Sequence, residues 1–452
     1  MIVLKSVQKG NKTIWTGKVF NKGVIIMKQQ NNKRSKLVIA AILMVVSLLS
    51  GCDRNSIDAA GNETVIEMVH GAADETKSVS TIVDPVELQT ESADDDEVTG
   101  TAETIEETEP EISLVMVGDI LLHTPVAQSG VQEDGSYDFH ALFANVKDEI
   151  EAADIALVNQ EVIIGGEELG ITGYPSFNAP YELGDALVDA GFDVMLHATN
   201  HTLDKGKKGV MNCLSFWKNQ YPAIAVLGIN DSSEAQENNI FVYEQEGIRI
   251  AVLNYTYGTN GIPMPSDMPY AVNLLHESKV AEDVKKAKAQ ADFVIVCPHW
   301  GTEYRLEPSA DQQYWTKQFL ENGVDLVIGT HPHVIEPVEW VKDENGNEML
   351  VYYSLGNFVN WTSSSGKGIA NRMVGGMAEV TIARDEDGDV FVKNYRIEPL
   401  VCHLEDGVNG VTTYFLSDYT DALASQNAII AQDSVFSREY CETLCETVWG
   451  NE

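Results

Sequence analysis

The sequence predicts an α/β fold in which helices cover the faces of a sheet of buried strands. Three observations carry this prediction. From residue 112 onward, short apolar runs rich in strand-forming residues recur along the chain, stretches that read as helices separate them, and polar residues follow most of the runs directly. Apolar strands that alternate with helices are typical of α/β sheets with both faces covered.

The expected elements follow one another in a regular order. The predicted strands are Ile112–Val117, Ile155–Val158, Val194–Leu196, Ile248–Leu253, Phe293–Cys297, Leu326–Ile328 and Met349–Tyr353. The predicted helices are Phe139–Ala153, Tyr181–Ala190, Gly206–Gln220, Ser278–Ala291 and Gln312–Asn322. Past Gly366 we expect two antiparallel strands, Gly375–Ile382 and Val390–Pro399, that complete or flank the sheet. The segment 406–452 is predicted to be helical, chiefly over Ser417–Gly450.

The N-terminal part of the chain has the composition of a targeting signal. Four basic residues between positions 28 and 36 precede the apolar run Leu37–Leu49, and Leu49-Ser50-Gly51-Cys52 follows at once. This apolar run is shorter than the roughly 20 residues that span a membrane, and the arrangement is that of a secretory signal peptide. An uncleaved anchor helix is the alternative.

The tetrapeptide that ends at Cys52 resembles a bacterial lipobox, whose cysteine is lipidated. We therefore expect residues 27–52 to be a lipoprotein signal and the chain to be anchored at the extracytoplasmic face of a bacterial membrane. Met27 directly precedes this signal. Residues 1–26 match no part of a signal peptide, so we interpret them as an upstream extension wrongly included in the gene.

The acidic charge of the chain is concentrated in one segment. The formal net charge is −39, and 18 Asp and Glu residues lie between Asp53 and Glu111, against Arg54 and Lys77 alone. Residues 53–110 contain too little apolar surface to offset the entropy of ordering, which predicts a disordered, extended stalk. A chain this acidic repels nucleic acid, so we exclude nucleic acid as a partner.

The six cysteines form no zinc-ribbon or CxxC pattern. Single cysteines in structured stretches, such as Cys213, are expected to be buried free thiols. Cys441 and Cys445 lie four residues apart, a spacing that is poor for a disulfide within one helix, and their pairing stays open.

Metal-capable side chains follow the predicted strands repeatedly. They are Asp119, His123, Glu161, Asn200 with His201, His299, and His331 with His333. In open α/β sheets the ligand site lies beyond the carboxyl ends of the strands. Carboxylates, imidazoles and an amide oxygen form a ligand set for one or two first-row divalent ions. Together these positions predict a metal site.

These residues lie in strings that resemble the CapA family of poly-γ-glutamate capsule biosynthesis proteins, relatives of the calcineurin-like metallophosphoesterases. The strings run in the family's order over about residues 112–360: VGDIL from Val117, VNQE ending at Glu161, ATNH ending at His201, HWGTEY from His299, GTHPHV from Gly329 and SLGNF from Ser354. The resemblance implies a layered β-sandwich flanked by helices over residues 111–405.

The resemblance also implies roles for the residues. Asp119 resembles the first metal carboxylate and Glu161 the bridging one. Asn200 resembles a ligand of the second metal, and His201 beside it the acid or transition-state stabiliser. His299, His331 and His333 resemble the imidazole ligands of two divalent ions (Mn, Fe, Zn or Mg). Asn357 is a candidate support for the site floor. The superfamily's opening D-x-H is absent, and His123 stands four residues after Asp119 as a candidate for the missing ligand.

Two functions follow from this reading. One is a metal-dependent hydrolase of the phosphoesterase kind that acts on a cell-surface polymer or a phosphoester, within a capsule synthesis or export complex. The other is a non-catalytic export or tethering factor for such a polymer. We favour the enzyme, because the ligand set fits catalysis. A solute-binding lipoprotein would fit the anchor and leave the ligand set unexplained.

Overall fold

The computed structural model describes residues 2–9, 12–19, 110–405 and 410–450. The chain divides into two units, Met1–Ala102 and Glu103–Glu452. In the first, β1 (Ile2–Lys9) and β2 (Lys12–Val19) form an antiparallel pair. The predicted signal around Cys52, and the predicted stalk up to residue 109, lie outside the described residues. None of the helices among the described residues is both long and apolar enough to cross a membrane.

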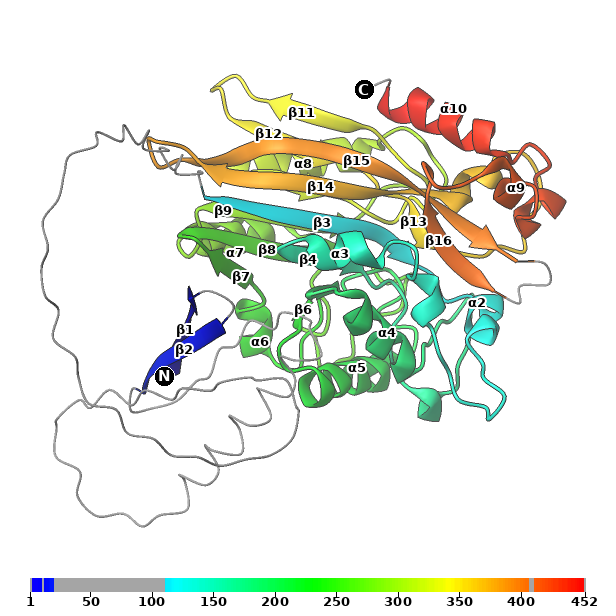
Figure 1. The fold of residues 1–452 in the computed structure, drawn as a ribbon, viewed down its shortest axis with the longest axis horizontal. Coiled ribbons are helices and arrows are strands. Elements are labelled where there is room, and N and C mark those ends of the chain that lie inside the picture. The colour runs from blue at the N-terminus through cyan, green and yellow to red at the C-terminus, as the bar shows by residue number, and fades with distance from the viewer. Residues whose placement is uncertain (1, 10–11, 20–109, 406–409, 451–452) are drawn as a thin grey trace, which may run out of the picture. The chain divides into compact units, whose positions relative to one another are not determined.

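The second unit contains two mixed sheets (Figure 1). The first has the order β16-β15-β14-β3-β4-β5-β6, and β13 pairs with the end of β3. Its strands are β3 (Glu111–Ile120), β4 (Ile155–Asn159), β5 (Val194–Leu196), β6 (Ala225–Leu227), β13 (Asn357–Val359), β14 (Val374–Arg384), β15 (Val390–Leu404) and β16 (Val411–Phe415). Strands β3 to β6 run parallel, whereas β14, β15 and β16 pair antiparallel.

The second sheet has the order β11-β12-β10-β9-β8-β7. Its strands are β7 (Phe241–Gln245), β8 (Ile248–Thr256), β9 (Phe293–His299), β10 (Leu326–Ile328), β11 (Val338–Lys342) and β12 (Glu348–Tyr352). The four central strands are parallel and the edge strands β7 and β11 are antiparallel to their neighbours. Each sheet therefore has a parallel half whose carboxyl ends can gather polar residues.

The two sheets pack face to face through alternate residues of their strands. In β3, Ile112, Leu114 and Met116 join Ile250 and Ile295 of the second sheet in one buried cluster. The residues between them point to the opposite face, as the two-residue period of a strand requires. The layered β-sandwich flanked by helices is thus confirmed.

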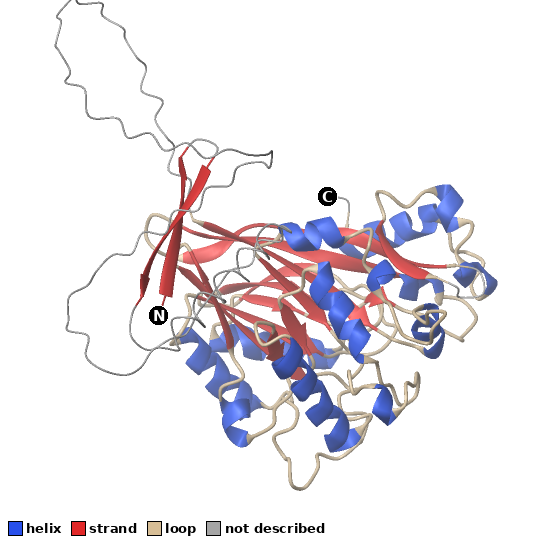
Figure 2. Cartoon of the chain, turned by 60° about the horizontal axis from the view of Figure 1, so that its bottom comes forward, coloured by secondary structure: helices blue, strands red, loops and turns tan. Residues whose placement is uncertain are grey.

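Helices cover the outer faces of the sandwich (Figure 2). Helices α4 and α5 pack on the first sheet and α7 and α8 on the second. The helices are α2 (Thr124–Ser129), α3 (Lys147–Ala152), α4 (Tyr181–Ala190), α5 (Gly206–Gln220), α6 (Ser233–Glu237), α7 (Glu277–Lys288), α8 (Ala310–Asn322), α9 (Asp421–Ala424) and α10 (Arg438–Trp449), with 3-10 turns η1 (His140–Leu142), η2 (Glu167–Leu169), η3 (Ala370–Met373) and η5 (Ala428–Ala431).

Three predictions about the elements need correction. The predicted helix Phe139–Ala153 is a 3-10 turn followed by the short helix α3, because Phe139 and Phe143 are both drawn into the core. The predicted helical segment 406–452 begins with β16, which pairs with β15, so the sheet extends beyond residue 405. The predicted strands Ile112–Val117 and Phe293–Cys297 end too early, because β3 continues to Ile120 and β9 to His299; Asp119 and His299 therefore lie at the strand ends, as expected.

The cysteines of the described residues are free and buried. Cys441 and Cys445 both lie in α10, where they face the core without forming a disulfide. The prediction of buried thiols at Cys213, Cys297 and Cys402 is confirmed.

Candidate metal centre

The parallel halves of the two sheets bring their carboxyl ends to one place. The first sheet contributes Asp119 at the end of β3, Glu161 after β4, and Asn200 with His201 after β5. The second sheet contributes His299 at the end of β9, and His331 with His333 after β10. All seven side chains are buried. The predicted convergence at the carboxyl ends is therefore present, and the residues come from two sheets rather than one.

A close backbone approach fixes Asp119. A Cβ atom at Gly118 would lie 2.0 Å from the carbonyl oxygen of Gly356, so only glycine fits there. The Asp119 N–H donates to that same carbonyl at 3.0 Å, and β13 pairs with β3 at this point. The turn that carries Gly356 therefore locks the end of β3.

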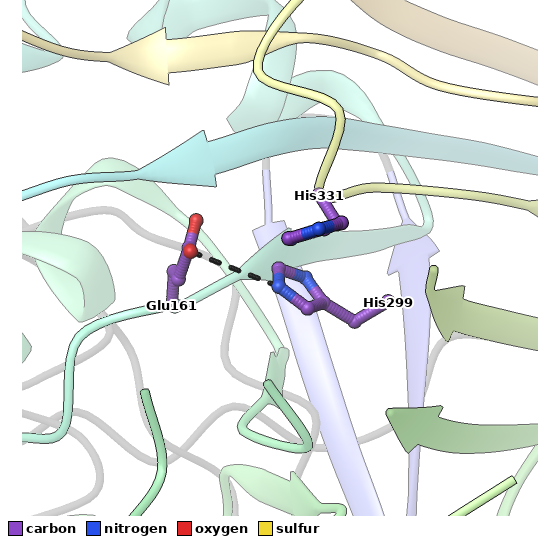
Figure 3. A group of neighbouring side chains, drawn as sticks. All are labelled: Glu161, His299 and His331. Carbon is purple, nitrogen blue, oxygen red and sulfur yellow. Dashed lines mark ion pairs between the residues drawn. The ribbon is translucent and has the colours of Figure 1, made fainter. Parts of the chain in front are cut away.

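Glu161 belongs to two groups of potential ligands. One group is Glu161, His299 and His331, and the other is Asp119, Glu161 and His333. In each group one ligand atom per residue lies within 4.8 Å of the others. Figure 3 shows the first group, with the Glu161 carboxylate directed toward the His299 ring; Glu161 Oε1 lies 3.7 Å from His299 Nε2. A shared carboxylate between two ligand groups is the arrangement of a bridging ligand.

In the second group His333 lies between two carboxylates. Its Nδ1 lies 3.0 Å from Asp119 Oδ2 and 3.1 Å from Asn357 Oδ1, and both of these oxygens are acceptors. Its Nε2 lies 3.6 Å from Glu161 Oε1. Burial lowers the pKa of His333, but Glu161 and Asp119 outweigh burial and raise that pKa to about 9. Asn159 Nδ2 donates to Asp119 Oδ1 at 2.8 Å. These contacts orient the Asp119 carboxylate.

The first group is kept neutral by burial. Burial and the neighbouring imidazoles hold the pKa values of His299 and His331 well below their usual range. His299 Nε2 lies 3.0 Å from Asn200 Oδ1, which places the Asn200 amide oxygen beside the group. Neutral imidazoles have a free nitrogen lone pair, the state in which histidine binds a metal.

Buried polar atoms without partners show that divalent ions fit this site. Both carboxylate oxygens of Glu161 and Nδ1 of His331 are buried and form no hydrogen bond within the described part of the chain. Burial raises the pKa of Glu161 well above its usual range. Buried polar atoms normally have partners, so orphaned ligand atoms in a carboxylate and imidazole cluster indicate where cations bind.

The backbone at His331 and His333, which flank Pro332, is unusual. His331 has φ 101° and His333 has φ 58°, values that residues other than glycine seldom adopt. The His331 N–H donates to Asp119 Oδ2 at 3.2 Å, so the strained loop is fixed to the opposite sheet. Strained backbone of this kind accumulates at functional sites. The H-P-H string therefore places both imidazoles in the centre.

His201 lies outside both ligand groups. Its Nδ1 is 2.7 Å from Asp204 Oδ2, and its ring packs edge-on against Phe177, with centroids 4.7 Å apart. Asn260 Nδ2 approaches the same ring at 3.4 Å. An imidazole held by a carboxylate beside a metal site is suited to donate a proton. Sequence analysis did not single out Asp204, although its position three residues after His201 was a usable signal.

His123 and Asn357, the two further candidates from the sequence, lie in different parts of the site. His123 belongs to neither ligand group, and its ring packs against Phe177 and Trp361. Burial lowers the pKa of His123 to about 3. Asn357 lies on the floor of the site, where its Nδ2 donates to the His333 carbonyl at 3.0 Å.

Other residues of the site were not singled out from the sequence as site residues, although Tyr304 ends the string HWGTEY. Tyr257 lies against His331, with ring centroids 4.7 Å apart, and Tyr304 lies 6.0 Å from His333 by the same measure. Arg372 stacks on Tyr304. All three are separated in sequence from the residues they contact, so only the fold brings them together.

A family model described as "Bacterial capsule synthesis protein PGA_cap" matches residues 113–362. The chain belongs to this family. The match covers more than half of the chain and contains every ligand position described above. The predicted resemblance to CapA proteins is thereby confirmed at the level of the family.

Two curated relatives of this PGA_cap chain are CapA proteins. The capsule biosynthesis protein CapA of Bacillus anthracis is 32% identical over 195 residues, which cover 41% of this chain and 45% of the relative. The PGA biosynthesis protein CapA of Bacillus subtilis is 31% identical over 189 residues, covering 39% and 45%. The chain thus spans a little under half the length of these relatives.

Solved nucleotidase structures show a more distant similarity. The 5'-nucleotidase precursor of Thermus thermophilus is 15% identical with a TM-score of 0.39, covering 64% of this chain and 54% of the other. The NAD nucleotidase of Haemophilus influenzae is 13% identical with a TM-score of 0.37, covering 65% and 58%. Residue roles in the PGA_cap chain therefore rest on its own geometry.

Proposed function

We propose that this PGA_cap protein is a divalent-metal-dependent hydrolase of the phosphoesterase kind that acts in the synthesis or export of a capsule polymer such as poly-γ-glutamate. The single observation that carries the proposal is Glu161, a buried carboxylate shared by two ligand groups, neither of whose oxygens forms a hydrogen bond with a described residue. The CapA names of the relatives support the process. They do not supply the reaction, so the reaction is argued from the site.

The site residues divide into two sets. Asp119, Glu161 and His333 would hold one divalent ion, and Glu161, His299 and His331 with the Asn200 amide would hold the other. When bound, such ions supply Lewis acidity and lower the pKa of a water that attacks an ester. The ligand types suit Mn, Fe, Zn or Mg.

The remaining residues act on the substrate side. His201, oriented by Asp204, holds a proton for the leaving oxygen. The buried position of Glu161 and the histidines excludes bulk water, which strengthens each electrostatic contact within the site. Together these features favour hydrolysis of an ester or a similar linkage at the mouth of the site.

The location of the protein is part of the proposal. A lipid anchor at the extracytoplasmic face of a bacterial membrane is supported by the N-terminal sequence: basic residues from Lys28 to Lys36, the apolar run Leu37–Leu49, and the lipobox-like tetrapeptide that ends at Cys52. A protein held there would meet a cell-surface polymer and a capsule synthesis or export complex. A radioactive fatty acid should label the wild type and not the Cys52→Ala variant. Labelling of the variant would contradict a lipid anchor at Cys52.

The hydrolase is tested with the full chain and the variant His331→Ala. Metal analysis of the purified protein should find about two divalent ions per chain. The protein should also cleave one of two substrates: the phosphodiester bis-p-nitrophenyl phosphate, or poly-γ-glutamate, whose units are joined by amide bonds. His331→Ala should lose the cleavage and one ion, whereas the matched control His140→Ala, an exposed histidine paired with Asp138, should keep both. If the purified protein contains no divalent ions after they have been supplied in excess, the proposal of a metal-dependent hydrolase is refuted. Bound ions without turnover of either substrate would favour the tethering factor.

A further inference from the structure

Arg372 is anchored to the floor of the metal centre by its main chain. Its carbonyl oxygen accepts from Asn357 Nδ2 at 2.9 Å and from Asn360 Nδ2 at 3.3 Å. Asn357 in turn contacts His333 with both its amide oxygen and its amide nitrogen. The 3-10 turn η3, which carries Arg372, is therefore held in a fixed relation to the predicted metal ligands.

The side chain of Arg372 is also held in place. Its Cζ atom lies 3.5 Å from the centroid of the Tyr304 ring, and its Nη1 donates to Thr362 Oγ1 at 3.3 Å. The Tyr304 ring centroid lies 6.0 Å from that of His333. A stacked guanidinium loses little freedom when it binds a ligand, because its plane is already fixed. The cation is thus positioned beside the metal centre.

The charge of Arg372 is not neutralised by a neighbouring carboxylate. Within the described part of the chain, no ion pair joins its guanidinium to a carboxylate, whereas four of the five other arginines there form ion pairs. These are Arg249, Arg384, Arg396 and Arg438. Nε of Arg372 is buried and has no hydrogen-bond partner among the described residues. In a chain with a net charge of −39, an arginine left unpaired beside the site is notable.

The segment that follows Thr362 in the chain carries further hydrogen-bond donors, and its Ser364 N–H donates to the same Thr362 hydroxyl oxygen that accepts from Arg372. Ser363, Ser364 and Ser365 are exposed, and so is Lys367, which likewise forms no ion pair with a described residue. The Arg372 guanidinium is suited to an oxyanion, since its planar fork matches the geometry of carboxylate and phosphate oxygens.

We propose that Arg372, supported by Tyr304 and Thr362, binds an oxyanion of the substrate beside the metal centre. This inference rests on the proposed function and narrows it: the substrate carries a carboxylate or phosphate group away from the bond that is cleaved. Arg372 is thus a specificity residue. It lies beyond the family match, which ends at residue 362.

The test measures binding of two probes, inorganic phosphate and glutarate, by isothermal titration calorimetry on the full chain loaded with Mn²⁺. Arg372→Met should weaken binding of the preferred probe about 10-fold or more, and Arg372→Lys should give an intermediate loss, because lysine keeps the charge without the planar fork. The matched control is Arg305→Met. Arg305 is exposed, forms no ion pair with a described residue and adjoins Tyr304, and its loss should change the affinity less than about 2-fold. Circular dichroism verifies that each variant is folded.

The outcomes separate this inference from the proposed function. An unchanged Kd in Arg372→Met, or failure of the wild type to bind either probe at millimolar concentration, overturns the role of Arg372. If binding depends on Arg372 but no substrate is hydrolysed, the oxyanion site stands and the hydrolase fails. Tighter binding of glutarate supports a carboxylate polymer, and tighter binding of phosphate supports a phosphoester.

Discussion

Replacing Glu161 by glutamine should abolish most of the stabilisation that divalent ions give the protein. Glutamine keeps the shape of the side chain and removes the charge that both ligand groups share. At a free ion concentration of 100 times Kd, each bound ion stabilises the folded state by about 2.7 kcal/mol, so two ions give about 5 kcal/mol. The unit Glu103–Glu452 has about 350 residues, for which 1 kcal/mol corresponds to about 1.4 °C in Tm. The wild type should therefore gain about 7 °C on addition of Mn²⁺, and Glu161→Gln less than about 2 °C.

The assay is thermal denaturation with and without Mn²⁺, preceded by removal of bound ions with a chelator. Glu336→Gln is the matched control, because Glu336 is equally buried, has one unpartnered carboxylate oxygen and lies in neither ligand group. It should keep the full gain of the wild type. An equal gain in Glu161→Gln and the wild type would refute the assignment of Glu161 as the bridging ligand.

Three further substitutions test individual features. Burial raises the pKa of Glu336 to about 8, so its protonated form is favoured in the folded state. The wild type therefore loses stability as the pH rises from about 4.5 through 8. Glu336→Gln should match the wild type at pH 4 and exceed it by about 3 kcal/mol in the free energy of unfolding at pH 7, measured by urea denaturation. Asp204→Asn should lower kcat about 10–100-fold with an unchanged metal content, because Asp204 orients His201 and belongs to neither ligand group; loss of metal would contradict this. Gly118→Ala should destabilise by more than about 1–3 kcal/mol, since its Cβ would meet a carbonyl oxygen at 2.0 Å, whereas Gly258→Ala, with open space around it, should stay within about 0.5 kcal/mol.

The sequence predicted the parallel strands and most helices because their signals are local. The helix Tyr181–Ala190 and the strand Val194–Leu196 have the predicted bounds. Continuous apolar runs mark strands that are covered on both faces, and Gly191 in a left-handed conformation ends the helix. The break within Phe139–Ala153 could not be predicted in the same way. Tertiary packing of Phe143 against Phe358 decides the conformation there, and that contact is distant in sequence.

The ligand set was predictable for a related reason. Each ligand stands at or next to the end of an apolar run, and the fold brings those ends together. The division of the ligands between two sheets was not predictable, because strand order depends on long-range pairing, such as β14 with β3. Arg372 had no pattern around it that marked a site. Tyr304 ends the string HWGTEY, but its contacts with Arg372 and His333 depend on the fold. His123, a candidate because of its residue type and its position near Asp119, belongs to neither ligand group.

The origin of the candidate ligands in both sheets has a consequence for how the proposed ions would be acquired. Neither sheet alone carries a complete ligand group: Asp119 and Glu161 come from one, and His299, His331 and His333 from the other. The ligand groups therefore exist only after the two sheets have docked, so tight binding follows folding. A chain that is exported before it folds would take its ions from the compartment in which it folds. The metal content of the mature protein would then report the ions available outside the cytoplasm rather than those present during synthesis.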